Sequence, residues 1–465
     1  MESNKDLVII GAGPGGYVAA IRAAQLGLST TLVEKDKRLG GTCLLRGCIP
    51  TKALLETAYL YTKARSFKEF GITIGAASID WPTVQQRKDR LVLRLAKGVE
   101  SLMKKNQVEV INGRAHLAGT GLVEIVAEGG SSRRIAAKNV LIATGSEPKI
   151  FPPFDVHHPA IITSNEALEL MAIPSTIAVV GAGAVGVEFA SIFQAVGSQV
   201  TIIEILDHIL PFEDPDVAAA LHAELAKRGI RIHAATRVDA LTPMENAVRL
   251  RITGPKETAE ADFEKVLVAV GRRPVTENMG LDKLGIAVEK GFIKVDEYCR
   301  TNVPGHYAIG DCIATPQLAH VASAEGKMAV ERIASSDARP LNYDQVPFCT
   351  YCDPEVARVG LTEAEARKRG AEVGIGKFPF AALGKAGIVG HREGFVKIIA
   401  DKRFGEILGC SIIGPHATEL ISEPASFMAA EGTMWEMLSM MHAHPTLYES
   451  ILEAAEAWTG HPIHM

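Results

Sequence analysis

The pattern of apolar and small residues near the start of the chain predicts a strand, a tight turn and a helix. In the stretch DLVIIGAGPGGYVAA, the apolar run Leu7–Ile10 is followed by three spaced glycines, Gly11, Gly13 and Gly16. A second apolar run, STTLVE, then ends in Glu34. Strand, glycine turn, helix, strand and acidic residue, in this order, form the dinucleotide-binding fingerprint. The glycines allow the backbone to approach a pyrophosphate at the helix N-terminus, and Glu34 can accept hydrogen bonds from ribose hydroxyls.

The same fingerprint occurs a second time, in register with the first. The stretch TIAVVGAGAVGVEFA carries Gly181, Gly183 and Gly186, and the following run QVTIIE ends in Glu204. Each of these four residues lies 170 positions after its counterpart. Because a repeated pattern is far more specific than one glycine motif, the sequence predicts an α/β protein with two Rossmann-like dinucleotide-binding domains.

The residues after Glu204 indicate which nucleotide the second domain binds. Ile205, Leu206, Asp207 and His208 follow it, without an Arg or Lys. A 2′-phosphate would therefore meet an uncompensated carboxylate, which favours NAD over NADP.

Three further patterns predict strands that end in glycine turns. They are VLIATGSEP (140–148), VLVAVGRRP (266–274) and YAIGDC (307–312). The last leads into Asp311, which taken alone could be a helix cap, but which at a strand end also suits a ribitol hydroxyl. Because this strand comes after the second nucleotide domain, we expect the chain to return and complete the first.

Length and composition describe an ordinary globular protein. A chain of 465 residues is too long for one core, and its net charge of -5 gives no reason to expect a nucleic-acid partner.

The most apolar run, Ile177–Val187, stops at Glu188, short of the ~20 residues of a membrane-spanning helix. MESNK leads straight into the first strand and leaves no room for a signal peptide. We therefore expect a cytoplasmic protein, although a processed organellar protein would have the same features.

Cys43 and Cys48, in GGTCLLRGCIPTKALL (40–55), are close together in a chain with only seven cysteines. An odd number of scattered cysteines argues against the disulfide framework of a secreted protein. In an ideal helix, residues five apart have Cα atoms ~8.6 Å apart, whereas a disulfide needs roughly 4.4–6.8 Å. The two can join only if the turn around Gly47 is distorted, and such a bond is easily reduced. Lys52 follows Cys48 by four residues, where a cation favours a thiolate.

A metal site is the weaker interpretation because it needs four ligands. The only other C-x-x-C is CTYC (349–352), which has apolar neighbours and no nearby His pair, so it is predicted to pack within a strand. The sequence thus favours a redox pair and predicts no metal site.

A candidate base lies near the C-terminus, in MMHAHPTLYES (440–450). Thiol–disulfide exchange runs through a thiolate, so it needs a base that works near neutral pH. His444 is followed five residues later by Glu449, which could orient it. By composition alone, His442 could equally be the base.

Together these motifs resemble the pyridine nucleotide–disulfide oxidoreductases, over nearly the whole chain. GGTCLLRGCIPTKALL is similar to the family's redox-disulfide helix and HAHPTLYE to its base segment, while ATG, AVGRRP, YAIGD and LAH occur in the expected order. The resemblance implies FAD in the first nucleotide site, NAD in the second, and a C-terminal α+β dimerisation domain that forms a homodimer. The implied domains are 1–149 (FAD-binding), 150–275 (NAD-binding), 276–345 (central, completing the FAD site) and 346–465 (interface).

The resemblance also implies roles for individual residues. The implied catalytic residues are Cys43, Cys48, Lys52, Glu188, His444 and Glu449. The substrate thiol, deprotonated by His444 from the other subunit, would attack Cys43, and Cys48 would lie against the flavin. Lys52, paired with Glu188, would lie near the flavin's reactive edge.

The implied cofactor-binding residues form two sets. Those for FAD are Gly11, Gly13, Gly16, Glu34, Gly41, Thr42, Lys52, Ala115, Thr144, Gly145, Asp311 and Ala319. Those for NAD are Gly181, Gly183, Gly186, Glu204, Val238 and Gly271. The implied activity is oxidation of dihydrolipoamide on a lipoyl domain of a 2-oxoacid dehydrogenase or glycine-cleavage complex.

Some residues depart from the family pattern, and other functions compete. Leu45 and Arg46 stand where the family usually has Asn-Val, and Arg46 either tunes the thiolate or faces solvent. The cysteine pair in CTYC and Tyr448 are also atypical.

Other functions compete with this interpretation. Glutathione reductases should carry arginines after the second fingerprint, and mercuric reductases should carry a cysteine pair near the C-terminus, whereas the last cysteine here is Cys410. An NADH-dependent reductase of another disulfide is one alternative. A non-catalytic flavoprotein subunit is another, but it would need neither the cysteine pair nor the base.

Overall fold

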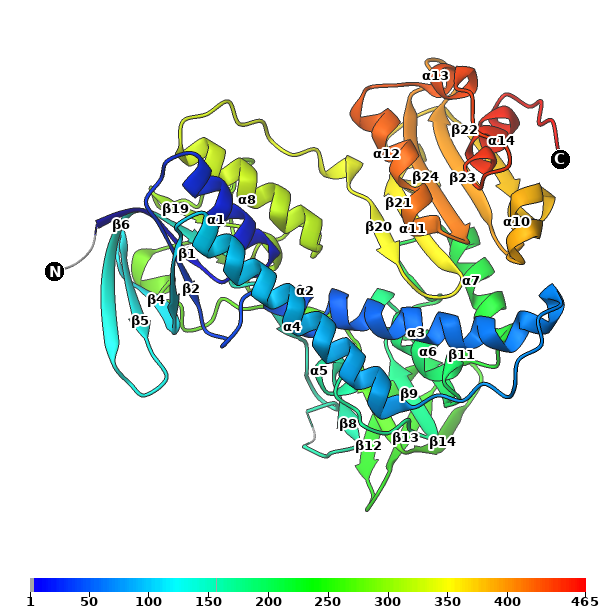
Figure 1. Ribbon diagram of the computed structural model, residues 1–465, viewed down its shortest axis with the longest axis horizontal. Coiled ribbons are helices and arrows are strands. Elements are labelled where there is room, and N and C mark those ends of the chain that lie inside the picture. The colour runs from blue at the N-terminus through cyan, green and yellow to red at the C-terminus, as the bar shows by residue number, and fades with distance from the viewer. Residues whose placement is uncertain (1–3, 156) are drawn as a thin grey trace. The chain divides into compact units, whose positions relative to one another are not determined.

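The computed structural model describes residues 4–155 and 157–465, which form two compact units (Figure 1). The first unit comprises Met1–Ala53, Thr83–Lys149 and Gly271–Leu341. The second comprises Leu54–Pro82, Ile150–Val270 and Asn342–Met465. Across the described ranges, no helix is both long and apolar enough to cross a membrane.

The first unit is built on one sheet with strand order β3-β2-β1-β6-β5-β4 (Figure 1). Its parallel strands are β1 (Asn4–Ile10), β2 (Thr30–Glu34), β3 (Glu109–Asn112) and β6 (Ser132–Ile142). The antiparallel strands β4 (Arg114–Gly119) and β5 (Leu122–Val126) extend it along the first half of β6. Leu7, Val8 and Ile9 are fully buried, as expected for a central strand covered on both faces.

The chain returns to this sheet after the second fingerprint, as the order of motifs predicted. Strand β19 (His306–Ala308) pairs in parallel with the end of β6. It leads through Gly310–Cys312 to helix α8 (Ala319–Ile333), which packs on α1 (Pro14–Gln25). The helices approach closely, because a Cβ on Gly326 would lie 2.7 Å from the carbonyl oxygen of Gly15.

Short elements complete the first unit. Strands β7 (Ser146–Pro148) and β16 (Arg272–Pro274) pair with each other directly after the two predicted glycine turns. Strands β17 (Val288–Glu289) and β18 (Phe292–Ile293) form a small hairpin. Helix α2 (Gly41–Arg46) lies in the first unit. Helix α3 (Cys48–Ser66) begins in the first unit and ends in the second, whereas α4 (Trp81–Lys105) begins in the second unit and continues in the first.

The second unit contains the second fingerprint on a parallel sheet of order β11-β10-β9-β15-β8. These strands are Arg231–His233, Gln199–Ile203, Thr176–Val180, Lys265–Val268 and Ile161–Ile162, respectively. Its helices are α5 (Ser164–Ala167), α6 (Ala184–Ala195) and α7 (Pro215–Lys227). An antiparallel sheet follows, made of β12 (Arg237–Pro243), β13 (Val248–Thr253) and β14 (Thr258–Phe263). The two-domain Rossmann-like prediction is confirmed.

The C-terminal part of the second unit is an antiparallel sheet of order β20-β21-β24-β23-β22 with helices around it (Figure 1). The strands are Phe348–Thr350, Glu355–Gly360, Ile407–Gly414, Phe395–Asp401 and Val373–Pro379, respectively. The helices are α9 (Glu363–Lys368), α10 (Gly384–Val389), α11 (Ala417–Leu420), α12 (Ser422–Ala429), α13 (Met434–Ser439) and α14 (Glu449–Trp458). This is the predicted α+β arrangement. The exact domain boundaries stay a prediction.

Candidate active site

The two neighbouring cysteines lie on either side of a helix break. Helix α2 ends at Arg46, and α3 begins at Cys48. Between them, Gly47 has φ -143° and ψ -113°, which interrupts the helix as the sequence predicted. A Cβ on Gly47 would lie 2.9 Å from the Thr42 carbonyl oxygen and 3.2 Å from the Cα of Cys43. Glycine is therefore needed for the close approach that brings the two cysteines together.

The side chains of Cys43 and Cys48 are hydrogen-bonded to each other. This hydrogen bond is the main reason why the pKa of the Cys43 thiol is raised, and burial raises it further. The positive charge of Lys52 acts in the opposite direction. One thiolate of the pair can thus be stabilised by the other S–H group and by Lys52, which suits thiol–disulfide exchange.

A polar chain leads from Arg272 to Asp311 in the same unit. Arg272 Nε donates to Ser146 Oγ at 2.7 Å, and its Nη2 donates to the Ser146 carbonyl oxygen at 2.8 Å. The Ser146 hydroxyl in turn donates to the Asp311 carboxylate. Burial lowers the pKa of Arg272, while the negative charges of Asp311 and Cys48 partly oppose this. Arg272 is thus a second cation, besides Lys52, within electrostatic range of the cysteine pair.

The first fingerprint forms a cradle of the shape that a pyrophosphate requires. A Cβ on Gly11 would lie 2.3 Å from the Ala143 carbonyl oxygen, and one on Gly16 only 1.8 Å from the Gly11 carbonyl oxygen. Gly13 is the N-cap of α1, so no side chain covers the N–H groups of the first helical turn. This arrangement fits the pyrophosphate of a dinucleotide such as FAD.

Glu34 lies at the end of β2, beside this cradle, and only 5% of it is exposed. Its Oε2 accepts a 2.7 Å hydrogen bond from the Ala12 N–H, and its Oε1 a 2.9 Å bond from the Asp36 N–H. Burial raises the pKa of Glu34. A carboxylate has about four acceptor sites, so Glu34 can hold the glycine loop and still accept from a ribose hydroxyl.

The second fingerprint has the same construction. A Cβ on Gly186 would lie 1.9 Å from the Gly181 carbonyl oxygen, and Gly183 is the N-cap of α6. Glu204 Oε2 accepts from the Ala182 N–H at 2.6 Å, and Oε1 accepts from the Leu206 N–H at 2.9 Å. The cradle fits a second dinucleotide such as NAD.

The structure also locates the other residues implied for the cofactors. Ala319 is the first residue of α8, Thr42 lies in α2 and Ala115 in β4, while Val238 is a buried residue of β12. Thr144 Oγ1 donates to the Val275 carbonyl oxygen at 2.6 Å. Of these other implied residues, the glycines Gly41, Gly145 and Gly271 all adopt positive φ angles. Their contacts with nucleotides stay a prediction.

Lys52 and Glu188 lie in different units, so their predicted pairing stays a prediction. Glu188 belongs to α6 and is 4% exposed. Its Oε1 accepts a 3.0 Å hydrogen bond from the backbone N–H of Tyr351. This contact involves the atypical CTYC segment, for which the sequence suggested packing alone.

His444 and Glu449 form the pair that the sequence proposed. The Nδ1 of His444 lies 2.8 Å from Glu449 Oε1, and Glu449 Oε2 accepts from the Thr446 N–H at 2.8 Å. Partial burial raises the pKa of Glu449, but the hydrogen bonds from Thr446 and His444 outweigh it, and the pKa is lowered. The His444 side chain is 81% exposed. Glu449 therefore orients the His444 ring, while most of the ring stays accessible to solvent.

The alternative base, His442, has a different environment. Its side chain is only 3% exposed, and its Nε2 lies 2.8 Å from Glu423 Oε1. A buried histidine with an internal partner is poorly placed to reach a substrate thiol, so His444 is the better candidate, and its role as the base stays a prediction.

The prediction that CTYC packs within a strand is confirmed only in part, because Cys352 lies beyond the end of β20 (Phe348–Thr350). Cys349 lies in β20, and Cys352 is buried, which raises its pKa well above the usual value. A buried thiol of this kind is not reactive.

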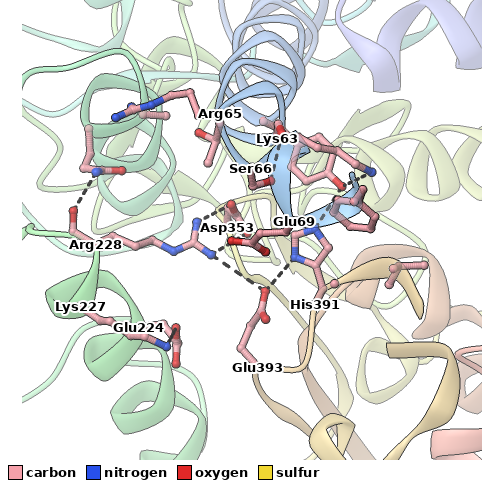
Figure 2. A pocket seen from close by; sticks show the side chains of 17 residues that line it. Lys63, Arg65, Ser66, Glu69, Glu224, Lys227, Arg228, Asp353, His391 and Glu393 are labelled. Carbon is pink, nitrogen blue, oxygen red and sulfur yellow. Dashed lines mark hydrogen bonds and ion pairs between the residues drawn. The ribbon is translucent and has the colours of Figure 1, made fainter. Parts of the chain in front are cut away.

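A cleft of about 420 Å³ in the second unit was not predicted from the sequence (Figure 2). Asp353, His391 and Glu393 offer ligand-type atoms there within 4.8 Å of one another. However, Arg228 already pairs with Asp353, with Nη2 3.0 Å from Oδ1, and lies 4.0 Å from Glu393. His391 Nδ1 lies 3.1 Å from Glu393 Oε1, and this hydrogen bond raises the pKa of His391. The guanidinium thus neutralises the carboxylates that a metal would need.

Sequence comparisons agree with this geometry. A family model described as "Pyridine nucleotide-disulphide oxidoreductase" matches residues 5–326, and its dimerisation-domain counterpart matches residues 346–455. The chain belongs to this family. Because members of this family use FAD and NAD, its two nucleotide sites are those of FAD and NAD, as predicted. Its C-terminal domain is the dimerisation domain.

Individual relatives are similar over the whole length. A protein named dihydrolipoyl dehydrogenase from Bacillus subtilis is 44% identical over 474 residues, covering 100% of both chains. The mitochondrial dihydrolipoyl dehydrogenase of Pisum sativum is 40% identical, covering 100% of this chain and 93% of its own. Among solved structures, LpdA from Mycobacterium tuberculosis has a TM-score of 0.90 at 29% identity, covering 98% of this chain and 99% of its own. An HOCl-induced flavoprotein disulfide reductase, RclA from Escherichia coli, has a TM-score of 0.85 at 28% identity, covering 96% and 98%.

Proposed function

We propose that the protein is an FAD-containing dihydrolipoyl dehydrogenase that works as a homodimer and reduces NAD. The observation that carries this proposal is the contact between the Cys43 and Cys48 thiols across the Gly47 break. It occurs in a chain with two nucleotide cradles whose relatives with this name match it over its full length.

The chemistry of the cysteine pair supports oxidation of a dithiol. In the disulfide state, one thiolate of the dihydrolipoyl group attacks Cys43, the Cys43–Cys48 bond breaks, and Cys48 leaves as a thiolate. The second substrate thiol then gives up its proton and attacks the substrate sulfur of the mixed disulfide. The cyclic lipoyl disulfide is released, and Cys43, which leaves as a thiolate, takes up that proton. Two electrons have then passed to the cysteine pair, and bound FAD would supply the redox centre that takes them on to NAD.

Four ionisable side chains support these steps. His444 accepts the proton of the attacking thiol, and Glu449, at 2.8 Å from its Nδ1, holds the ring in orientation. The positive charge of Lys52 favours a thiolate at Cys43, and Arg272 interacts electrostatically with Cys48, the leaving thiolate. Because His444 is 81% exposed in the single chain, we assign it to the redox pair of the second copy in the homodimer.

The second cradle supports NAD as the acceptor. Glu204 is followed by Ile205 and Leu206, which are 67% and 48% exposed. Apolar side chains at this position offer no partner for a 2′-phosphate, and the Glu204 carboxylate would repel it. We propose a cytoplasmic protein whose substrate is the lipoyl domain of a 2-oxoacid dehydrogenase or glycine-cleavage complex.

Steady-state reduction of NAD by dihydrolipoamide tests the proposal, with NADP in parallel and Cys48→Ser as the inactive control. Turnover with NAD that is lost in Cys48→Ser is the expected result. A yellow, FAD-loaded protein without this turnover would contradict it. NADH-dependent reduction of other disulfides would then be measured, since RclA is named as a disulfide reductase.

A further inference from the structure

Arg46 is unusual in the cysteine loop, and the structure ties it to a distant part of the same loop. It is the last residue of α2, next to Gly47 and two residues before Cys48. Its Nη2 pairs with the Oδ2 of Asp36, which lies just beyond the end of β2. The side chains are 38% and 25% exposed, so the pair is partly shielded from water. The ion pair therefore closes the segment 36–46, which carries Cys43.

Asp36 is itself held in place. Its N–H donates to Glu34 Oε1 at 2.9 Å, and its carbonyl oxygen accepts from Asn112 Nδ2 at 2.9 Å. The other oxygen of Glu34 accepts from the Ala12 N–H at 2.7 Å. Arg46 is thus anchored through Asp36 to the same carboxylate that holds the first glycine loop.

Helix α2 needs such an anchor because it is short. It has six residues between Gly40 and Gly47, and its N-cap, Gly40, has no side chain to cap it. A helix of this length is not stable by itself. Gly40 N–H donates to the Ala12 carbonyl oxygen at 2.9 Å, which fixes the start of the helix. The Arg46–Asp36 pair fixes its end.

We propose that Arg46 is a positioning residue whose ion pair with Asp36 holds α2, and with it Cys43, at the distance from Cys48 that disulfide formation requires. The proposal rests on the proposed function, since it assumes that the two cysteines form the redox pair. It replaces the two interpretations that the sequence left open, direct tuning of the thiolate and simple exposure to solvent.

The experiment measures the disulfide itself in the full-length, FAD-loaded protein. Each variant is equilibrated in glutathione redox buffers and trapped with iodoacetamide, and the oxidised fraction of the peptide with both cysteines is measured by mass spectrometry. The variants are Arg46→Val, Asp36→Ala and the charge reversal Asp36→Arg with Arg46→Asp. Lys37→Val is the matched control, because Lys37 is a cation of the same loop that is 86% exposed.

Positioning predicts the same change for both single variants. Loss of either partner loosens α2 and lowers the effective concentration of one thiol at the other, so the disulfide-to-dithiol equilibrium constant falls about fivefold. The charge reversal restores it, and Lys37→Val leaves it unchanged. Far-ultraviolet circular dichroism and bound FAD confirm that each variant is folded.

Two results would overturn the proposal. Opposite changes in Arg46→Val and Asp36→Ala would mean that Arg46 acts directly on the thiolate, because removal of Asp36 leaves its charge uncompensated. An unchanged equilibrium in both would make Arg46 an ordinary surface residue. If the wild-type protein formed no Cys43–Cys48 disulfide at all, the proposed function itself would fail, which this measurement distinguishes.

Discussion

The carboxylate of Glu449 lies 2.8 Å from Nδ1 of His444, and the His444 side chain is 81% exposed to solvent. His442, two residues earlier, has an equivalent carboxylate partner in Glu423, but it is buried. The same chemical pair thus occurs twice within a few residues, once accessible and once within the fold. This difference allows the proposed base to be tested against a matched internal control.

Glu449→Gln should lower kcat for dihydrolipoamide oxidation about 10²-fold, because the amide orients the imidazole without stabilising its protonated form. Oxidation of the cysteine pair in glutathione buffer should be unchanged, since Glu449 does not take part in it. Glu423→Gln is the control: it removes the carboxylate from His442 and should lower thermal stability while the folded enzyme keeps its kcat. Equal losses of kcat in both variants would contradict the assignment.

The accessible histidine could not be identified from the sequence alone. His442 and His444 are separated by one residue and have similar neighbours, and only the fold brings His442 against Glu423 of α12, where its side chain is buried. The two fingerprints and the Gly47 break were predictable, because their geometry is local and depends on glycine at fixed spacing.

Arg272 was missed for the same reason as the accessible histidine. It approaches Ser146 and Asp311 only because β7 pairs with β16. Arg272 and Ser146, which this pairing joins by a hydrogen bond, are 126 positions apart in the sequence. The cleft around Arg228, Asp353 and Glu393 likewise combines residues from distant segments (Figure 2). Long-range strand pairing leaves little trace in a single sequence, so such contacts become visible only in the fold.

Gly47→Ala should impair the cysteine pair. The new Cβ would lie 2.9 Å from the Thr42 carbonyl oxygen and 3.2 Å from the Cα of Cys43, so α2 must move away from α3. We expect destabilisation of about 1–3 kcal/mol and a smaller oxidised fraction in glutathione buffer.

Gly98→Ala is the matched control for this substitution. Among the described residues, no heavy atom outside the neighbouring helix backbone lies within 4 Å of a Cβ at Gly98, which lies inside α4. Alanine should therefore stabilise the protein by roughly 0.5–1 kcal/mol. Denaturant unfolding of both variants checks the prediction, and an unchanged Gly47→Ala protein would show that the break needs no glycine.

Ile205→Arg should shift the nucleotide preference. Ile205 is 67% exposed directly after Glu204, so an arginine there is accommodated and can pair with a 2′-phosphate. We expect kcat/KM for NADP to rise about tenfold, with a smaller change for NAD. Phe212→Arg, at a side chain that is 81% exposed in the same unit, is the control for added charge. The specificity model is wrong if both arginines raise NADP use equally.

Glu213 should make the stability of the second unit dependent on pH. Burial raises the pKa of Glu213 from 4.5 to about 7, although Arg358, at 3.4 Å, acts in the opposite direction. Between these values the folded state keeps a proton that the unfolded state has lost, so the contribution to stability is complete below pH 4.5 and is lost as the pH rises through about 7.

Glu213→Gln cannot titrate, so it should gain stability relative to the wild type between pH 5 and pH 8, by on the order of 1–3 kcal/mol. Denaturant unfolding at the two pH values measures this gain, and the exposed Glu245→Gln serves as the control for loss of a surface charge. Other titrating groups contribute equally to both proteins and cancel in the comparison. Parallel stability profiles for Glu213→Gln and wild type would mean that Arg358 keeps the carboxylate ionised throughout, so that the ion pair outweighs burial at this position.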